Sequence, residues 1–251
     1  MRLARCAGPV LLCISSLVVA QQQQAPPHAP DGGTREFIQS LQIPPKPNAP
    51  FSATVTTELT KILVDGNKQA NGNHRLVARD SSGRVFQERR IFMPDGDKAQ
   101  TPVMELDYAD PSRHELFVCR PSQKVCYEYA YNPPPWKDAA PIQAITPADA
   151  AAGGRSVKVE DLGRQTIDGV DTLGSRSIIT IAQGTMGNEK EEPIVKEFWY
   201  SEQLGINVIT KRFDPRFGAQ NFTVGNISRG EPDPKLFVMP QDYRVVKMSA
   251  Q

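Results

Sequence analysis

The sequence predicts a mainly β protein, a curled antiparallel sheet that is half-barrel or barrel-like, with about ten strands and one or two short helices. From residue 51 onward, runs that alternate apolar and polar residues recur along the chain. Turn signals separate these runs about every 8 to 12 residues, which is typical of a sheet that curls into a barrel or sandwich. Almost no segment shows the period of an amphipathic helix.

Residues 1–20 have the three-part layout of a secretory signal peptide. Arg2 and Arg5 precede an apolar stretch, and the small side chains of Val18 and Ala20 suit the signal peptidase, so we expect cleavage after Ala20. A retained membrane anchor is the alternative, but the stretch is shorter than the roughly 20 apolar residues that span a bilayer. We therefore expect a periplasmic or secreted protein with no integral membrane segment after cleavage.

Residues 21–50 are a Pro- and Gln-rich leader. We expect this leader to be disordered, because its composition buries too little apolar surface to offset chain entropy. A short helix is expected near 34–42, capped by Thr34 and ended by Pro44 and Pro45.

Residues 51–248 are expected to form a single β domain. In the first strand, Phe51, Ala53 and Val55 alternate with Ser52 and Thr54, which indicates a half-buried strand. Further strands are expected at 74–79, 84–92, 103–108, within 114–129, and at 156–162, 175–181, 195–201, 206–213, 222–229 and 243–247. The Pro- and Ala-rich stretch at 132–154 interrupts this pattern and is a candidate flap over the sheet.

The cysteines indicate one disulfide. Cys6 and Cys13 leave with the signal peptide, and Cys119 and Cys126 flank a turn between two β-prone runs that fold back as a hairpin. In an oxidising compartment this pair is expected to bond, and closing a loop of about eight residues stabilises the fold by roughly 2.5 kcal/mol. A redox pair would need a different gap, and a metal site would need further ligands near the two thiols.

Charge and motifs give no catalytic or metal-binding signature. The mature chain would carry 27 basic and 28 acidic residues, since the signal peptide contains two of the 29 basic ones, and this balance argues against a nucleic-acid binder. Of the three histidines, His74 and His114 fall on expected strands, but the chain has no G-x-S-x-G nucleophile motif and no histidine at metal-ligand spacing. We assign no catalytic, metal or cofactor-binding residue.

Two other groups of charged residues are candidate sites. Asp65-Gly66 and Asp95-Gly96 faintly resemble calcium loops, but neither continues with the spaced oxygen ligands, so both are interpreted as turns. Five arginines are expected on the solvated face of two adjacent strands, with an anionic-ligand patch as the alternative. These are Arg75, Arg79, Arg84, Arg89 and Arg90.

The chain contains six distinctive runs, at 51–55, 63–67, 79–84, 162–170, 197–201 and 236–246. Together they resemble a group of uncharacterised exported bacterial proteins, and the match covers most of the mature chain. More remotely, the chain is similar to the lipoprotein-carrier (LolA-like) half-barrel superfamily. That resemblance implies a curved antiparallel sheet around a hydrophobic cavity covered by helices. It assigns no activity to any residue.

The sequence favours a non-catalytic exported protein that binds an apolar or amphipathic, lipid-like ligand on the concave face of its sheet. No ligand-binding residue is assigned. The alternative is an envelope protein-interaction or structural module that recruits a protein partner through an exposed strand edge. A hydrolase comes third, and it would need His74 or His114 beside a nucleophile.

Overall fold

The computed structural model describes residues 41–133 and 154–248. The predicted signal peptide, the expected helix at 34–40 and nearly all of the excursion at 132–154 lie outside these residues. Leu41 and Gln42, the last two residues of that expected helix, are not helical.

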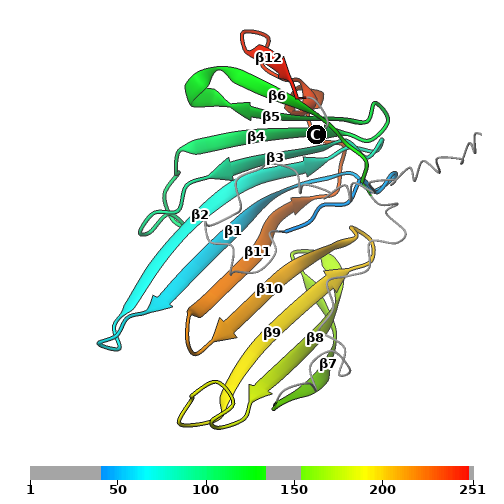
Figure 1. The fold of residues 1–251 in the computed structure, drawn as a ribbon. Helices are drawn as coiled ribbons and strands as arrows, with labels where there is room; N and C mark the ends of the chain where they lie inside the picture. Colours follow the sequence, from blue (N-terminus) through cyan, green and yellow to red (C-terminus); the bar gives the residue numbers. More distant parts are fainter. Residues whose placement is uncertain (1–40, 134–153, 249–251) are drawn as a thin grey trace, which may run out of the picture.

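The described residues form one curled sheet of twelve strands, slightly more than expected (Figure 1). Two short 3-10 helices accompany it, η1 (Pro121–Gln123) and η3 (Pro234–Phe237), at places where the sequence shows no helical period. The strands are β1 (Phe51–Ile62), β2 (Lys68–Arg79), β3 (Val85–Arg90), β4 (Val103–Asp110), β5 (Glu115–Arg120), β6 (Val125–Ala130), β7 (Arg155–Ile167), β8 (Val170–Ile181), β9 (Glu192–Ser201), β10 (Ile206–Asp214), β11 (Gly218–Ser228) and β12 (Arg244–Lys247).

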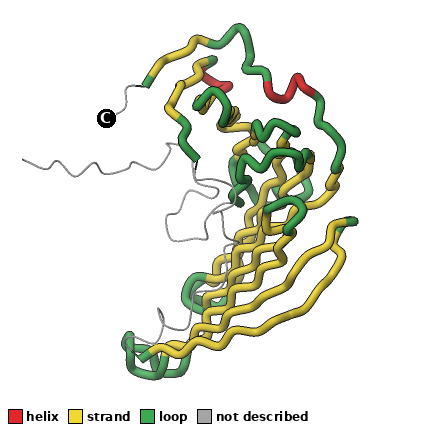
Figure 2. The backbone as a smooth tube through the Cα atoms, turned by 90° about the vertical axis from the view of Figure 1, so that its right-hand side faces the viewer, coloured by secondary structure: helices red, strands yellow, loops and turns green. Residues whose placement is uncertain are grey.

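The strand order explains how a chain of hairpins becomes a single sheet. Neighbours follow the order β12-β6-β5-β4-β3-β2-β1-β11-β10-β9-β8-β7, so two meanders meet where β1 pairs with β11. All neighbours are antiparallel except β12, which runs parallel to β6. The sheet does not close, and β7 and β12 are its two edges. Figure 2 shows the resulting open curve.

The two faces of the curve can be told apart by the C-terminal segment. Figure 2 shows η3 and the chain that leads to β12 on the outer side of the curve. Phe237 of η3 lies against the guanidinium of Arg84, 5.0 Å from it, and the register places Phe86 opposite Tyr108 on this outer face. Residues that alternate with Phe86 and its cross-strand partners therefore line the inner face.

The inner face carries most of the buried apolar side chains, as the alternation in β1 predicts. On β1 the buried positions are every second residue from Phe51 to Leu59. One apolar cluster surrounds the start of β1, and the segment at 41–50 packs on it through Leu41 and Ile43. A second cluster lies on β8 and β9, where Ile179, Ile181 and Ile194 are buried together.

Three of the five arginines expected on the solvated face are instead buried. Arg75, Arg79 and Arg89 are 1%, 0% and 5% exposed. The register places all three on the inner face, because Arg75 lies opposite Val55, Arg79 opposite Phe51, and Arg89 opposite the buried Glu105. The expectation was wrong because it treated charge as a marker of the solvent face, whereas the position in the alternation decides the face.

Arg79 joins the segment at 41–50 to the sheet. Its Nε and Nη2 atoms donate to the carbonyl of Ala49, its Nη1 donates to the carbonyl of Pro44 at 2.9 Å, and Nη2 also donates to the carbonyl of Leu204 at 2.7 Å. The guanidinium also lies over the ring of Phe51, 5.0 Å from its centre. Burial lowers the pKa of the Arg79 guanidinium to about 10.

The disulfide joins the cysteines that the sequence paired. Cys119 on β5 lies directly opposite Cys126 on β6, and the two are bonded. Both are fully buried. The turn between them contains η1 and ends at Lys124, whose φ of 50° lets the chain reverse.

Candidate ligand-binding face

The residues considered for catalysis lie apart from the inner face or in turns. His74 on β2 pairs with Thr56 on the outer face. His114 lies in the turn before β5 with a φ of 56°, not on a strand as expected. No hydrogen bond joins either histidine to a serine, threonine or cysteine side chain in the part of the chain that the structure describes. The geometry of these residues therefore offers no nucleophile and base pair.

The two aspartate-glycine pairs are turns, as interpreted from the sequence. Asp65 accepts a hydrogen bond from the backbone of Asn67, and Gly66 adopts a φ of 82°. Asp95 and Gly96 also lie in a turn. Within residues 41–133 and 154–248, no three His, Cys, Asp or Glu side chains come together as metal ligands.

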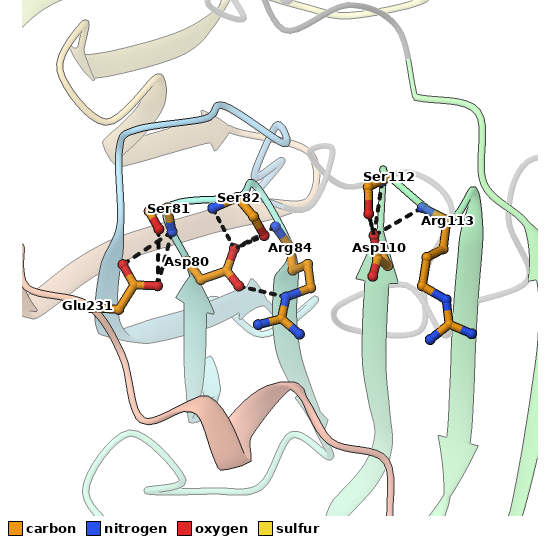
Figure 3. Close-up of polar contacts among 8 residues, drawn as sticks. All are labelled: Asp80, Ser81, Ser82, Arg84, Asp110, Ser112, Arg113 and Glu231. Atoms are coloured by element: carbon orange, nitrogen blue, oxygen red, sulfur yellow. Dashed lines mark hydrogen bonds and ion pairs between the residues drawn. The ribbon is translucent and has the colours of Figure 1, made fainter.

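A larger polar cluster occupies the turns at one end of the strands (Figure 3). Asp80 accepts four hydrogen bonds from Ser82 and Arg84, and Asp110 accepts three from Ser112 and Arg113. Glu231 of the C-terminal segment accepts from the backbone of Ser81. Because these acceptors already have protein donors, the cluster shapes turns and offers little to a ligand.

The inner face carries a row of polar side chains that crosses six strands, which we call the polar band. Asn73 lies opposite Thr57, Gln220 opposite Arg212, Arg212 opposite Lys196, and Lys196 opposite Ser177. Between Thr57 and Gln220 the row shifts by one inner-face position, since Gln220 lies opposite Leu59. The band consists of Asn73 on β2, Thr57 on β1, Gln220 on β11, Arg212 on β10, Lys196 on β9 and Ser177 on β8.

Several atoms of the polar band are buried without a hydrogen-bond partner. They are Oδ1 of Asn73, Oγ1 of Thr57, Oγ of Ser177 and both amide atoms of Gln220. The Nδ2 atom of Asn73, in contrast, donates to the carbonyl of Arg90 at 2.8 Å, and Arg212 donates to Asp214. Leaving a buried polar group without a partner costs about 1–3 kcal/mol, so native proteins rarely retain several in one place.

Apolar side chains flank the polar band. Along β9, Phe198 and Ile194 lie on either side of Lys196 and are both buried. On β11, Phe222 is the inner-face residue next to Gln220, and on β8 Ile179 is next to Ser177. On β9, and on β1 where Val55 and Leu59 flank Thr57, the inner face is thus apolar, then polar, then apolar along the strand direction.

The two short helices leave this part of the inner face free. Among the described elements, η1 packs on β4 and η3 packs on β3. None of the described helices is long and apolar enough to cross a membrane.

Sequence reasoning located the inner face but missed the polar band. The available signal was a polar residue at a position where the alternation predicts an apolar one, as at Thr57, Gln220 and Ser177. Each of these residues is ordinary on its own. Only the register of the strands shows that they lie in one row on the inner face.

No protein-family model and no curated protein matches the chain. Several solved structures align with it. An uncharacterized conserved protein from Thermus thermophilus aligns at a TM-score of 0.42 and 10% identity, covering 80% of this chain and 91% of its own. The Pseudomonas aeruginosa MucA/MucB complex structure aligns at 0.39 and 9%, covering 79% of this chain and 58% of the other. A LolA superfamily protein from Nitrosomonas europaea aligns at 0.28 and 9%, covering 77% and 92%.

The chain is remotely similar to the LolA superfamily.

Proposed function

We propose that this protein binds an amphipathic ligand whose apolar body lies along the inner face and whose polar group reaches the polar band. The observation that carries the proposal is the side chain of Gln220, which is 1% exposed and has neither a donor for its amide oxygen nor an acceptor for its amide nitrogen. A ligand with hydrogen-bonding atoms beside Gln220 would remove the free-energy cost of leaving this buried amide unpaired. The flanking apolar clusters suit the rest of such a molecule.

We also propose that the protein acts outside the cytoplasm, in the periplasm or as a secreted protein, after cleavage at Ala20. The bonded pair Cys119–Cys126 supports this, because disulfides form and persist in oxidising compartments. No catalytic step is part of the proposal.

The test is a titration of the purified, lipid-free mature protein with a fluorescent long-chain fatty acid. We expect saturable binding that weakens about tenfold in Gln220→Leu, since hydrogen bonds to the ligand are lost while the apolar surface remains. Thr223→Val is the matched control, because Thr223 lies on the same strand but is exposed on the outer face. The proposal fails if the wild type binds no probe, or if the two variants bind equally well.

A second candidate function, partner binding by strand addition, is favoured by the edge strand β7. This strand pairs only with β8 along its thirteen residues, and Val159 on it is 49% exposed. An extended segment of an envelope protein can pair with such an edge through backbone hydrogen bonds. Lys158→Pro, at an outer-face position opposite Ile178, would abolish capture of that partner in a pull-down, whereas it would leave the side chains of the inner face and their ligand binding intact.

A further inference from the structure

Two cations face each other on the inner face, at the end of the polar band that crosses β9 and β10. Lys196 lies directly opposite Arg212 in the antiparallel register. Like charges at directly opposed positions repel and destabilise the sheet. Burial, and then the charge of Arg212, lower the pKa of Lys196.

The nearby carboxylates do not form an ion pair with Lys196. Asp214 accepts from Arg212 at 3.3 Å and from Arg216 at 2.9 Å. Glu192 lies 3.6 Å from Arg216. Neither carboxylate is within ion-pair distance of Lys196, and among the described residues no other acidic group is.

Two neutral donors complete the arrangement. Ser177 lies opposite Lys196 and Gln220 lies opposite Arg212. The hydroxyl of Ser177 and the amide nitrogen of Gln220 are both buried without a partner. An ammonium, a guanidinium, a hydroxyl and an amide N–H from four adjacent strands therefore share one region of the inner face, and all four can donate to an oxyanion.

We propose that this region, formed by Lys196, Arg212, Gln220 and Ser177, binds the anionic head group of the ligand, so that the ligand is an anionic amphiphile. The inference rests on the proposed function and narrows it to a ligand class. A carboxylate or a phosphate supplies the acceptor oxygens that the two neutral donors lack. Its negative charge also offsets the repulsion between the two cations. A neutral head group would satisfy the donors but leave that repulsion in place.

The experiment compares ligands that share one chain and differ in the head group. Affinities of hexadecanoic acid, hexadecyl phosphate and hexadecanol are measured by displacement of the fluorescent probe at a pH where the acid is ionised. We expect the better of the two anions to bind at least about tenfold more tightly than the alcohol, as a charge-assisted hydrogen bond predicts. The order of the acid and the phosphate identifies the head group, and either order supports an anion site.

Matched variants assign the preference to its residues. Lys196→Met should remove most of the preference for the anions, measured as the ratio of the anion affinity to the hexadecanol affinity of the same variant. Lys211→Met is the control, since Lys211 is on β10 but exposed, and pairs with Glu197. Equal binding of acid, phosphate and alcohol by the wild type, or an anion preference that survives in Lys196→Met, would overturn the anion site while leaving amphiphile binding in place. Absence of binding to all three compounds would instead refute the proposed function itself.

Discussion

Replacing Arg79 with methionine should destabilise the protein by about 2–5 kcal/mol, because two buried backbone carbonyls lose their donor and a third loses one of its donors. The guanidinium donates to the buried carbonyls of Ala49 and Leu204 and to the carbonyl of Pro44, which also accepts from the backbone N–H of Lys46 at 2.8 Å. Without it, the carbonyls of Ala49 and Leu204 lose their donor at a cost of about 1–3 kcal/mol each, whereas that of Pro44 keeps the backbone N–H of Lys46. Part of this cost is offset because methionine, unlike arginine, buries no positive charge. That burial is unfavourable, as it lowers the pKa of Arg79 to about 10.

Urea unfolding followed by circular dichroism gives the free energy of unfolding of Arg79→Met and of two comparison variants. Arg79→Lys should fall between the wild type and Arg79→Met, since an ammonium on a flexible stem cannot reproduce the planar fork that reaches three carbonyls. Arg113→Met should change stability by no more than about 0.5 kcal/mol, because Arg113 forms an exposed ion pair with Glu115. A loss below about 1 kcal/mol in Arg79→Met would refute the reasoning, since it would mean that the carbonyls of Ala49 and Leu204 find other donors.

Three further predictions concern stability. Gln220→Leu should raise the free energy of unfolding of the ligand-free protein by about 1–2 kcal/mol in urea titrations, because it removes unpaired buried polar atoms; a destabilised variant would contradict this. Reduction of Cys119–Cys126 should cost roughly 2.5 kcal/mol and lower the melting temperature measured by calorimetry, and an unchanged melting temperature would count against a structural role. Burial alone would raise the pKa of Asp214, but hydrogen bonds from Arg216 and the charges of Arg216 and Arg212 outweigh it and lower the pKa. The stability contributed by this ionised carboxylate is therefore present above its unfolded-state pKa and is lost as the pH falls through the lower folded value. Asp214→Asn should consequently flatten the acid limb of a plot of the free energy of unfolding against pH. An unaltered acid limb would exclude this role.

Local pattern was enough to predict much of the fold. Gly66, Gly169 and Gly205 lie in turns at positive φ, as expected where a tight turn needs that conformation. Alternation placed Phe51, Ala53 and Val55 on the buried face of the first strand. Such features depend only on neighbouring residues, so a single sequence reveals them.

Strand length and the faces of some charged residues could not be predicted, because they depend on distant pairing. The seventh strand was expected at 156–162, whereas β7 continues to Ile167 past a bulge between Asp161 and Gly163. The eighth was expected from residue 175, but β8 begins at Val170. Both extensions exist because β7 and β8 pair with each other over almost their whole length. Exposed polar residues such as Arg164 and Gln165 give no local sign that the strand continues through them.

The candidate site shows the same limit more strongly. Arg79 finds its acceptors at residues 30, 35 and 125 positions away in the sequence. The polar band joins residues from both meanders, which meet only through the pairing of β1 with β11. A sequence without that register contains the polar residues but not the row they form.

The central claim, that the inner face binds the ligand, is tested most directly by methyl NMR with a spin-labelled fatty acid. The nitroxide broadens the signals of methyl groups close to the bound chain. We expect broadening at the inner-face residues Ile179, Ile194 and Val224, and sharp signals at the outer-face residues Ile178 and Ile209. Broadening that favours the outer-face methyl groups, or that affects neither set, would contradict the account.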